Sequence, residues 1–177
     1  EFDGYFKTSA DTHGVSYELL RKVGWNESRF NAKAVSPTKP RGVMQFTKAT
    51  GNAYGLVTDE DFFDPAKSID AGARYLSDLV KKYDGDELKA ALAYNQGEGT
   101  NGAPQLKAYD QGNFAGIGEE GRKYMRNLMD VAKSPQLGAL EAFGGITPTG
   151  KGIAFEDATA GIGCLLYTSD AADDGES

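Results

Sequence analysis

The segment from Asp64 to Gly85 constrains the fold more than any other part of the sequence. An aspartate followed by proline is typical of a helix start, because the carboxylate caps free backbone N–H groups and proline lacks the N–H that would go unpaired. Apolar residues then recur with the period of a helix that buries one face; they are Ala66, Ile69, Ala73, Leu76, Val80 and Tyr83. Asp84-Gly85 ends the pattern, so we expect one long helix with its apolar face in a core.

Several other segments carry the same helical period. The further helices expected cover residues 3–12, 16–28, 43–52, 86–95, 104–110 and 119–133. Residues 31–41 contain two prolines and are expected to be a loop, and Asp59-Glu60-Asp61 an acidic surface loop. We find no convincing strand pattern and no internal repeat. The prediction is a mostly α fold of six to eight helices with little or no β structure, built around Leu20, Val23, Ile69, Leu76, Val80, Leu92 and Leu128.

The chain of 177 residues is long enough for one domain with a sizeable core. We expect this domain to occupy residues 1–137. Residues 138–163 contain many glycines and the sequence Thr147-Pro148-Thr149. This composition is typical of a linker, here toward a missing downstream region. Residues 164–177 resemble a translated sequencing-adaptor read-through, and we expect them to be a non-native tail.

Composition narrows the possible chemistry. A single cysteine, Cys164, excludes an internal disulfide, and a single histidine, His13, leaves little room for a Ser-His-Asp or Cys-His arrangement. No Cys/His spacing suggests zinc, so we expect no metal and no cofactor. Residues 1–150 hold 20 of the 26 acidic and 18 of the 19 basic residues. Nothing in this near-neutral body suggests a nucleic-acid-binding face. With His, Cys and zinc sites set aside, any catalysis is expected to be carboxylate chemistry, the alternative being binding without catalysis.

Glu27 is the strongest candidate for such a carboxylate. It continues the stripe of Leu20, Val23 and Gly24 at the i+7 position, which is the face that a helix turns toward a core. Charged groups are rarely buried, and loss of water raises the pKa of a carboxyl group. A carboxyl that stays protonated near neutral pH can serve as a general acid. Spacing alone leaves open a solvated glutamate in the last helical turn.

Short motifs then follow one another along the chain. They are Glu27-Ser28-Arg29-Phe30, Ala34 with Ser36, Gly42-Val43-Met44-Gln45-Phe46, Ala93-Tyr94-Asn95-Gln96-Gly97, and Glu120 with Tyr124. The set resembles the soluble lytic transglycosylase domain, a lysozyme-like family that cleaves peptidoglycan, over about residues 5–131. Within that family, segments such as 14–23, 44–50, 84–92 and 124–128 resemble the transglycosylase domains that open the internal virion proteins of T7-like podoviruses.

This resemblance implies a lysozyme-like fold with a glycan-binding groove and a reaction that needs one carboxylate. Glu27 would protonate the leaving oxygen between N-acetylmuramic acid (MurNAc) and N-acetylglucosamine (GlcNAc). The substrate's own N-acetyl group would stabilise the cation, and Glu27 would then deprotonate the C6 hydroxyl that attacks C1. The product would be a 1,6-anhydro sugar. Most glycosidases instead use a second carboxylate, and no other acid here is placed convincingly by spacing.

The resemblance also implies roles for residues around Glu27. The expected substrate-binding residues are Ser36, Met44, Gln45, Tyr94, Asn95, Glu120 and Tyr124, with Tyr124 reaching toward Glu27. Each also has an ordinary structural explanation, such as a turn serine or a core methionine. Lys48 stands where the family commonly has proline, and Val43 where it commonly has leucine. Both departures concern the shape of the groove more than the chemistry.

The expected partner is the glycan strand of peptidoglycan, with other internal virion proteins reached through the missing downstream region. The expected location is the interior of a phage particle, with delivery to the bacterial periplasm; the alternative is the bacterial cell envelope. Two other functions stay open. One is a hydrolase resembling goose-type lysozymes, and the other is a structural virion domain that binds glycan without cutting it.

Overall fold

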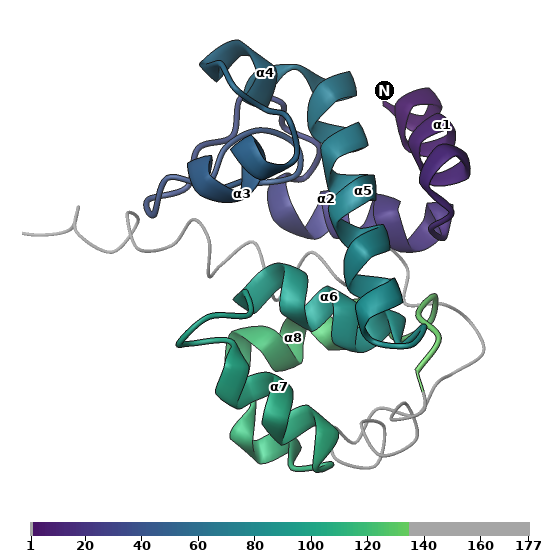
Figure 1. The fold of residues 1–177 in the computed structure, drawn as a ribbon, viewed down its shortest axis with the longest axis vertical. Coiled ribbons are helices and arrows are strands. Elements are labelled where there is room, and N and C mark those ends of the chain that lie inside the picture. Colours follow the sequence, from purple (N-terminus) through teal and green to yellow (C-terminus); the bar gives the residue numbers. More distant parts are fainter. Residues whose placement is uncertain (1, 135–177) are drawn as a thin grey trace, which may run out of the picture.

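The computed structural model describes residues 2–134 (Figure 1). The predicted linker (138–163) and tail (164–177) lie outside these residues. The described helices are α1 (Asp3–His13), α2 (Tyr17–Ser28), α3 (Lys48–Ala53), α4 (Asp59–Phe63), α5 (Pro65–Lys82), α6 (Glu87–Gln96), α7 (Ala103–Asp110), the 3-10 helix η1 (Phe114–Gly116) and α8 (Glu119–Leu128). Residues 2–134 contain no strand, only isolated bridges from Arg41 to Val35 and Phe46. The predicted mostly α fold is confirmed.

The long helices begin where their capping residues predict. The Asp64 carboxylate accepts hydrogen bonds from the backbone N–H groups of Ala66 and Lys67 at the start of α5. Ser16 caps α2 and Asp86 caps α6 in the same way. These caps satisfy donors that the first turn of a helix leaves unpaired. None of the described helices is both long and apolar enough to cross a lipid bilayer.

Three expected boundaries were wrong. Residues 43–46 are not helical, because Arg41 and Phe46 exchange two backbone hydrogen bonds of 3.0 Å and close a tight turn. The helix starts only at Lys48, after Thr47 as its cap. The expected acidic loop at 59–61 is the first turn of α4, where acidic side chains are favourable at the positive end of the helix. Helix α8 ends at Leu128 rather than near residue 133.

Helix α5 is the central element of the fold. It contacts α1, α2 and α4 along one part of its length and α6 near its C-terminal end (Figure 1). Helix α6 in turn contacts α7 and α8, and α8 returns to contact α2. Of the predicted core residues, Val80 is only partly buried and the others are fully buried. The return of α8 to α2 brings the last described helix beside the helix that carries Glu27.

Candidate active site

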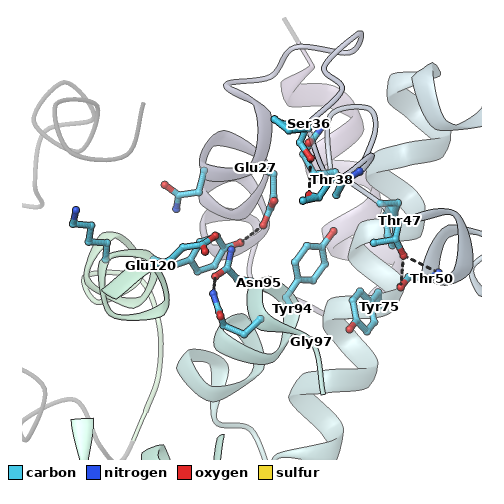
Figure 2. Close-up of a pocket in the computed structure, with 18 of the residues that line it drawn as sticks. Glu27, Ser36, Thr38, Thr47, Thr50, Tyr75, Tyr94, Asn95, Gly97 and Glu120 are labelled. Atoms are coloured by element: carbon cyan, nitrogen blue, oxygen red, sulfur yellow. Dashed lines mark hydrogen bonds between the residues drawn. The ribbon is translucent and has the colours of Figure 1, made fainter. Parts of the chain in front are cut away.

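A cavity of about 590 Å³ lies where α2, the 36–50 segment, α5, α6 and α8 meet (Figure 2). This volume is typical of a ligand site. Its lining is mostly polar and aromatic: Asn26, Glu27, Ser36, Pro37, Thr38, Pro40, Gln45, Phe46, Thr47, Thr50, Tyr75, Tyr94, Asn95, Gln96, Gly97, Glu119, Glu120, Lys123 and Tyr124. Hydroxyl and amide groups that can form hydrogen bonds therefore lie beside aromatic rings in this cavity.

Glu27 projects from the last turn of α2 into this cavity. The Tyr124 hydroxyl, 97 residues later in the sequence, donates a hydrogen bond of 2.8 Å to Glu27 Oε1. The pKa of Glu27 is raised to about 8: burial raises it most, the Tyr124 hydrogen bond partly opposes this, and the negative charge of Glu120 adds to the rise. Glu27 is therefore mostly protonated at neutral pH, which is the state a general acid requires.

The end of α2 is held firmly on both sides of Glu27. The Ser28 hydroxyl donates to the carbonyl of Val43 at 2.7 Å, which ties α2 to the 42–46 turn. Arg29 and Phe30 then adopt left-handed backbone angles, with φ of 56° and 62°. The Arg29 guanidinium lies over the Trp25 ring, and Phe30 contacts Trp25 edge-on. Such anchoring fixes the direction in which the Glu27 side chain points.

Tyr94 and Met44 form a pair in which only Tyr94 faces the cavity. The Tyr94 hydroxyl donates to the Met44 carbonyl at 3.0 Å. The Met44 side chain is 0 % exposed and fills space beside Gly24 and Gly72, where an added Cβ would lie 3.1 and 2.7 Å from it. The expectation that the Met44 side chain lines the groove is thus corrected: that side chain belongs to the core, and only the Met44 carbonyl meets a cavity residue, Tyr94.

Gln45 and Ser36 line the cavity from the turn and the proline-containing loop. The Gln45 side chain donates to the carbonyls of Gly42 at 2.8 Å and Ala34 at 3.3 Å, which joins the turn to the loop. The Ser36 hydroxyl pairs with the Thr38 hydroxyl at 3.2 Å. The hydrogen bond to Glu27 comes from Tyr124 and not from Ser36. Ser36 therefore lines the same cavity as Glu27, but its side chain bonds within its own loop.

Asn95 and Glu120 occupy the opposite wall (Figure 2). Asn95 ends the apolar stripe of α6 and is half-buried, and its side-chain oxygen accepts a hydrogen bond from Gln96. Glu120 lies in the first turn of α8, exposed at the rim, and acts on Glu27 through its charge. Six of the seven expected binding side chains therefore share one cavity with Glu27, and Met44 does not.

The sequence analysis missed several lining residues. Tyr75 lies beside the α5 stripe and packs between Phe46 and Tyr94, with ring centroids 6.2 and 5.0 Å away. The side-chain oxygen of Asn26, next to Glu27, accepts from Asn127 at 3.0 Å and forms a second bond between α2 and α8. Two features of the sequence could have indicated them: Tyr75 is an aromatic residue beside the apolar stripe of α5, and Asn26 is a polar residue next to Glu27.

The chain was then compared with known proteins. The family model described as the Transglycosylase SLT domain matches residues 4–117. This chain belongs to that family. It is 63% identical over 167 residues to the peptidoglycan transglycosylase gp16 of Escherichia phage T7, covering 92% of the chain and 13% of gp16. It is 37% identical to the membrane-bound lytic murein transglycosylase F 1 of Alkalilimnicola ehrlichii, covering 54% of the chain and 20% of that relative.

Solved structures of SLT proteins share the fold. An inactive Glu-to-Gln mutant of the lytic transglycosylase Slt from Pseudomonas aeruginosa superposes with a TM-score of 0.62 at 19% identity, covering 81% of this chain and 24% of the other. The 70 kDa soluble lytic transglycosylase of Escherichia coli gives 0.62 at 22% identity, covering 84% and 25%. The chain thus spans about a quarter or less of these proteins.

Proposed function

We propose that this SLT domain is a peptidoglycan lytic transglycosylase that cleaves the β-1,4 bond between MurNAc and GlcNAc and leaves a 1,6-anhydro-MurNAc end. The observation that carries the proposal is Glu27, whose pKa is raised to about 8 inside a cavity of sugar-binding character. The described residues contain no cluster of three or more His, Cys, Asp or Glu side chains that could hold a metal ion. The chemistry below uses only Glu27 and groups of the substrate.

In the first step, protonated Glu27 donates its proton to the glycosidic oxygen while the bond from that oxygen to C1 of MurNAc breaks. The GlcNAc portion leaves with a new hydroxyl group. The positive charge at C1 is shared with the carbonyl oxygen of the substrate's N-acetyl group. The Glu27 carboxylate that results accepts the Tyr124 hydrogen bond of 2.8 Å, which stabilises the charged form.

In the second step, the Glu27 carboxylate takes the proton of the C6 hydroxyl and the C6 oxygen bonds to C1. This returns Glu27 to its protonated state, and no water is consumed. A hydrolase would need another carboxylate to activate water. Of the two other acids at the cavity, Glu119 is bound to Lys123 at 2.8 Å, which lowers its pKa, and Glu120 is exposed. Glu120 is therefore the residue on which a hydrolytic alternative depends.

Mass spectrometry of digested peptidoglycan tests the proposal. We expect products lighter by one water than hydrolysed fragments and resistant to borohydride, because a 1,6-anhydro end has no free aldehyde to reduce. Reducing ends alone would show a hydrolase, with Glu120→Gln as the variant that should then lose activity. Glycan binding without any cleavage would indicate a structural role. Each result selects one of the three functions.

The similarity to gp16 of phage T7 supports a second part of the proposal. We infer that the full-length protein is carried inside a phage particle and opens the cell wall locally during genome ejection, in the periplasm, together with other internal virion proteins. The near-neutral charge of residues 1–150 fits a protein that is delivered to the wall rather than attracted to it. Phage carrying Glu27→Gln should inject DNA more slowly into cells with a densely cross-linked wall.

The pH dependence of the reaction should report Glu27. Because the protonated form is the active acid and its pKa is about 8, the Glu27 ionisation should leave kcat/KM level below about pH 7 and lower it above about pH 8. An unshifted glutamate would place the loss of the acid form near pH 4.5 instead. A pH–rate profile on soluble peptidoglycan fragments measures this fall in kcat/KM at alkaline pH directly. A fall in kcat/KM between pH 4 and 6 would contradict the assignment.

Replacement of Tyr124 by phenylalanine should move the alkaline fall in kcat/KM to higher pH. The hydrogen bond from Tyr124 lowers the pKa of Glu27, so its loss should raise the pKa, by roughly one unit if the bond contributes about 1.5 kcal/mol to the charged form. Tyr94→Phe is the matched control, since the Tyr94 hydroxyl donates to the Met44 carbonyl rather than to Glu27. An equal shift in both variants would show that Tyr124 has no specific effect on Glu27.

A further inference from the structure

A chain of side-chain amides leads from the start of α8 to the cavity. The backbone N–H of Gly118 donates to Gln105 Oε1 at 2.9 Å. Gln105 Nε2 donates to Gln96 Oε1 at 2.7 Å and to the carbonyl of Asn101 at 3.3 Å. Gln96 Nε2 then donates to Asn95 Oδ1. We call Gln105, Gln96 and Asn95 the amide relay; Gln96 and Asn95 both line the cavity that holds Glu27 (Figure 2).

The direction of the relay is set by its backbone ends. The backbone N–H of Gly118 can only donate, so Gln105 must present its oxygen there, and the carbonyl of Asn101 can only accept, so the nitrogen of Gln105 must lie on the other side. Each following amide must then accept with its oxygen and donate with its nitrogen. This ordering fixes which atom of each side-chain amide is the oxygen and which is the nitrogen, a choice that the shape of an amide alone leaves undetermined.

Packing keeps the first member of the relay in place. Gln105 lies on α7 and is half-buried against the start of α8. A Cβ at Gly118 would lie 3.3 Å from Gln105 Oε1, and one at Gly121 would lie 3.2 Å from the same atom and 2.9 Å from Leu92 Cδ1. The two glycines therefore leave just enough space for the Gln105 side chain, which has little freedom to rotate its amide.

We propose that Gln105 and Gln96 are positioning residues that hold the Asn95 side chain with its oxygen inside the relay and its N–H donors toward the cavity. The site would then select an acceptor oxygen of the glycan at this position, such as the carbonyl oxygen of an N-acetyl group, and reject a donor such as the ammonium of a de-N-acetylated sugar. This inference rests on the proposed function only for the identity of the glycan.

The relay can be reversed with one nearly isosteric change. In Gln105→Glu the carboxylate still accepts from the Gly118 N–H, but it cannot donate to Gln96. Gln96 must turn its nitrogen toward residue 105, and Asn95 must turn its nitrogen toward Gln96, so the Asn95 oxygen now faces the cavity. Gln105→Met is the matched control, because it removes the relay without reversing it and leaves Asn95 free to choose its orientation.

Binding of a β-1,4-linked tetramer of N-acetylglucosamine, measured by titration calorimetry in the Glu27→Gln background, tests the proposal without cleavage. A lost neutral hydrogen bond and an opposed oxygen together should weaken Kd about tenfold in Gln105→Glu, and the loss should be about threefold or less in Gln105→Met. In an Asn95→Ala background, Gln105→Glu should weaken Kd no further, because the effect passes through Asn95.

Two results would overturn the proposal: unchanged affinity in Gln105→Glu, or the same loss with and without the Asn95 side chain. If Gln105→Glu does not fold, the cycle of Gln105→Met with Asn95→Ala decides by the same non-additivity. The proposed function is judged separately from the products of the parent domain on peptidoglycan. The relay can therefore stand if the enzyme proves to be a hydrolase, and cleavage can stand if the relay fails.

Discussion

Glu27→Gln is expected to abolish cleavage of peptidoglycan while leaving the fold intact. Glutamine matches glutamate in shape, and its side-chain oxygen can still accept from the Tyr124 hydroxyl, but it cannot deliver a proton at neutral pH. General acid–base catalysis typically contributes roughly 10²–10⁴ in rate, and here one residue serves both steps. We expect a loss of at least about 10⁴, measured as release of soluble fragments, with glycan binding retained.

The same variant should be more stable at alkaline pH. The folded protein holds the Glu27 proton up to about pH 8, whereas an unfolded chain releases it near pH 4.5. The wild type therefore loses stability as pH rises through this window, and glutamine does not. The two proteins should melt alike below pH 4.5, and the variant should melt higher at pH 8, at roughly 4 °C per kcal/mol of stability gained.

Glu120→Gln provides the control for both measurements, because it removes an exposed carboxylate from the same cavity. It should keep its turnover and lower the pKa of Glu27, since the charge of Glu120 raises that pKa.

Retained turnover in Glu27→Gln would mean that another carboxylate carries the chemistry. Unfolding of Glu27→Gln would mean that Glu27 supports the structure instead.

Gly42→Ala is expected to lower the stability of the fold strongly. An added Cβ at this position would lie 1.9 Å from the Phe62 carbonyl oxygen. The backbone also has a φ of 77°, which residues other than glycine rarely adopt. Overpacking against fixed backbone costs about 1–3 kcal/mol, and the left-handed conformation adds about 1 kcal/mol or more. The turn that holds Gln45 in the cavity should shift as well, so both Tm and activity should fall.

Gly85→Ala separates the two causes. Gly85 has a φ of 87°, but an added Cβ would meet nothing within 4 Å. It should therefore cost only the conformational part, about 1 kcal/mol. Thermal melting of both variants in one buffer gives the comparison. An equal loss of Tm at the two positions would show that the structure accommodates the added Cβ beside the Phe62 carbonyl oxygen without losing stability.

The sequence predicted most of the helices because their signals are local. Asp64-Pro65, Ser16 and Asp86 mark helix starts through hydrogen bonds made within one turn, and the structure shows each of those bonds. The placement of Glu27 also follows from local periodicity, since the stripe on α2 continues into it. Local chemistry of this kind needs no knowledge of distant contacts.

The errors arose where distant segments decide the structure. The helix expected over residues 43–52 begins only at Lys48, because Arg41 and Phe46 close a turn by two backbone hydrogen bonds. Ser28 from α2 also bonds to the Val43 carbonyl in that turn. Met44 resembles a groove residue in its motif, and only the closeness of two glycines shows that its side chain fills the core. The amide relay joins α6, α7 and α8, so no single segment could reveal it.

The bond between Glu27 and Tyr124 has a consequence for the order in which the domain is made. Helix α2 leaves the ribosome about a hundred residues before α8, and the bond spans 97 positions. Until α8 has been made, Glu27 lacks the hydrogen bond from Tyr124. A nascent chain, or a proteolytic fragment, that ends before Glu119 lacks the wall of the cavity that α8 supplies. We therefore expect cleavage of glycan to require that α8 has been made and packed against α2.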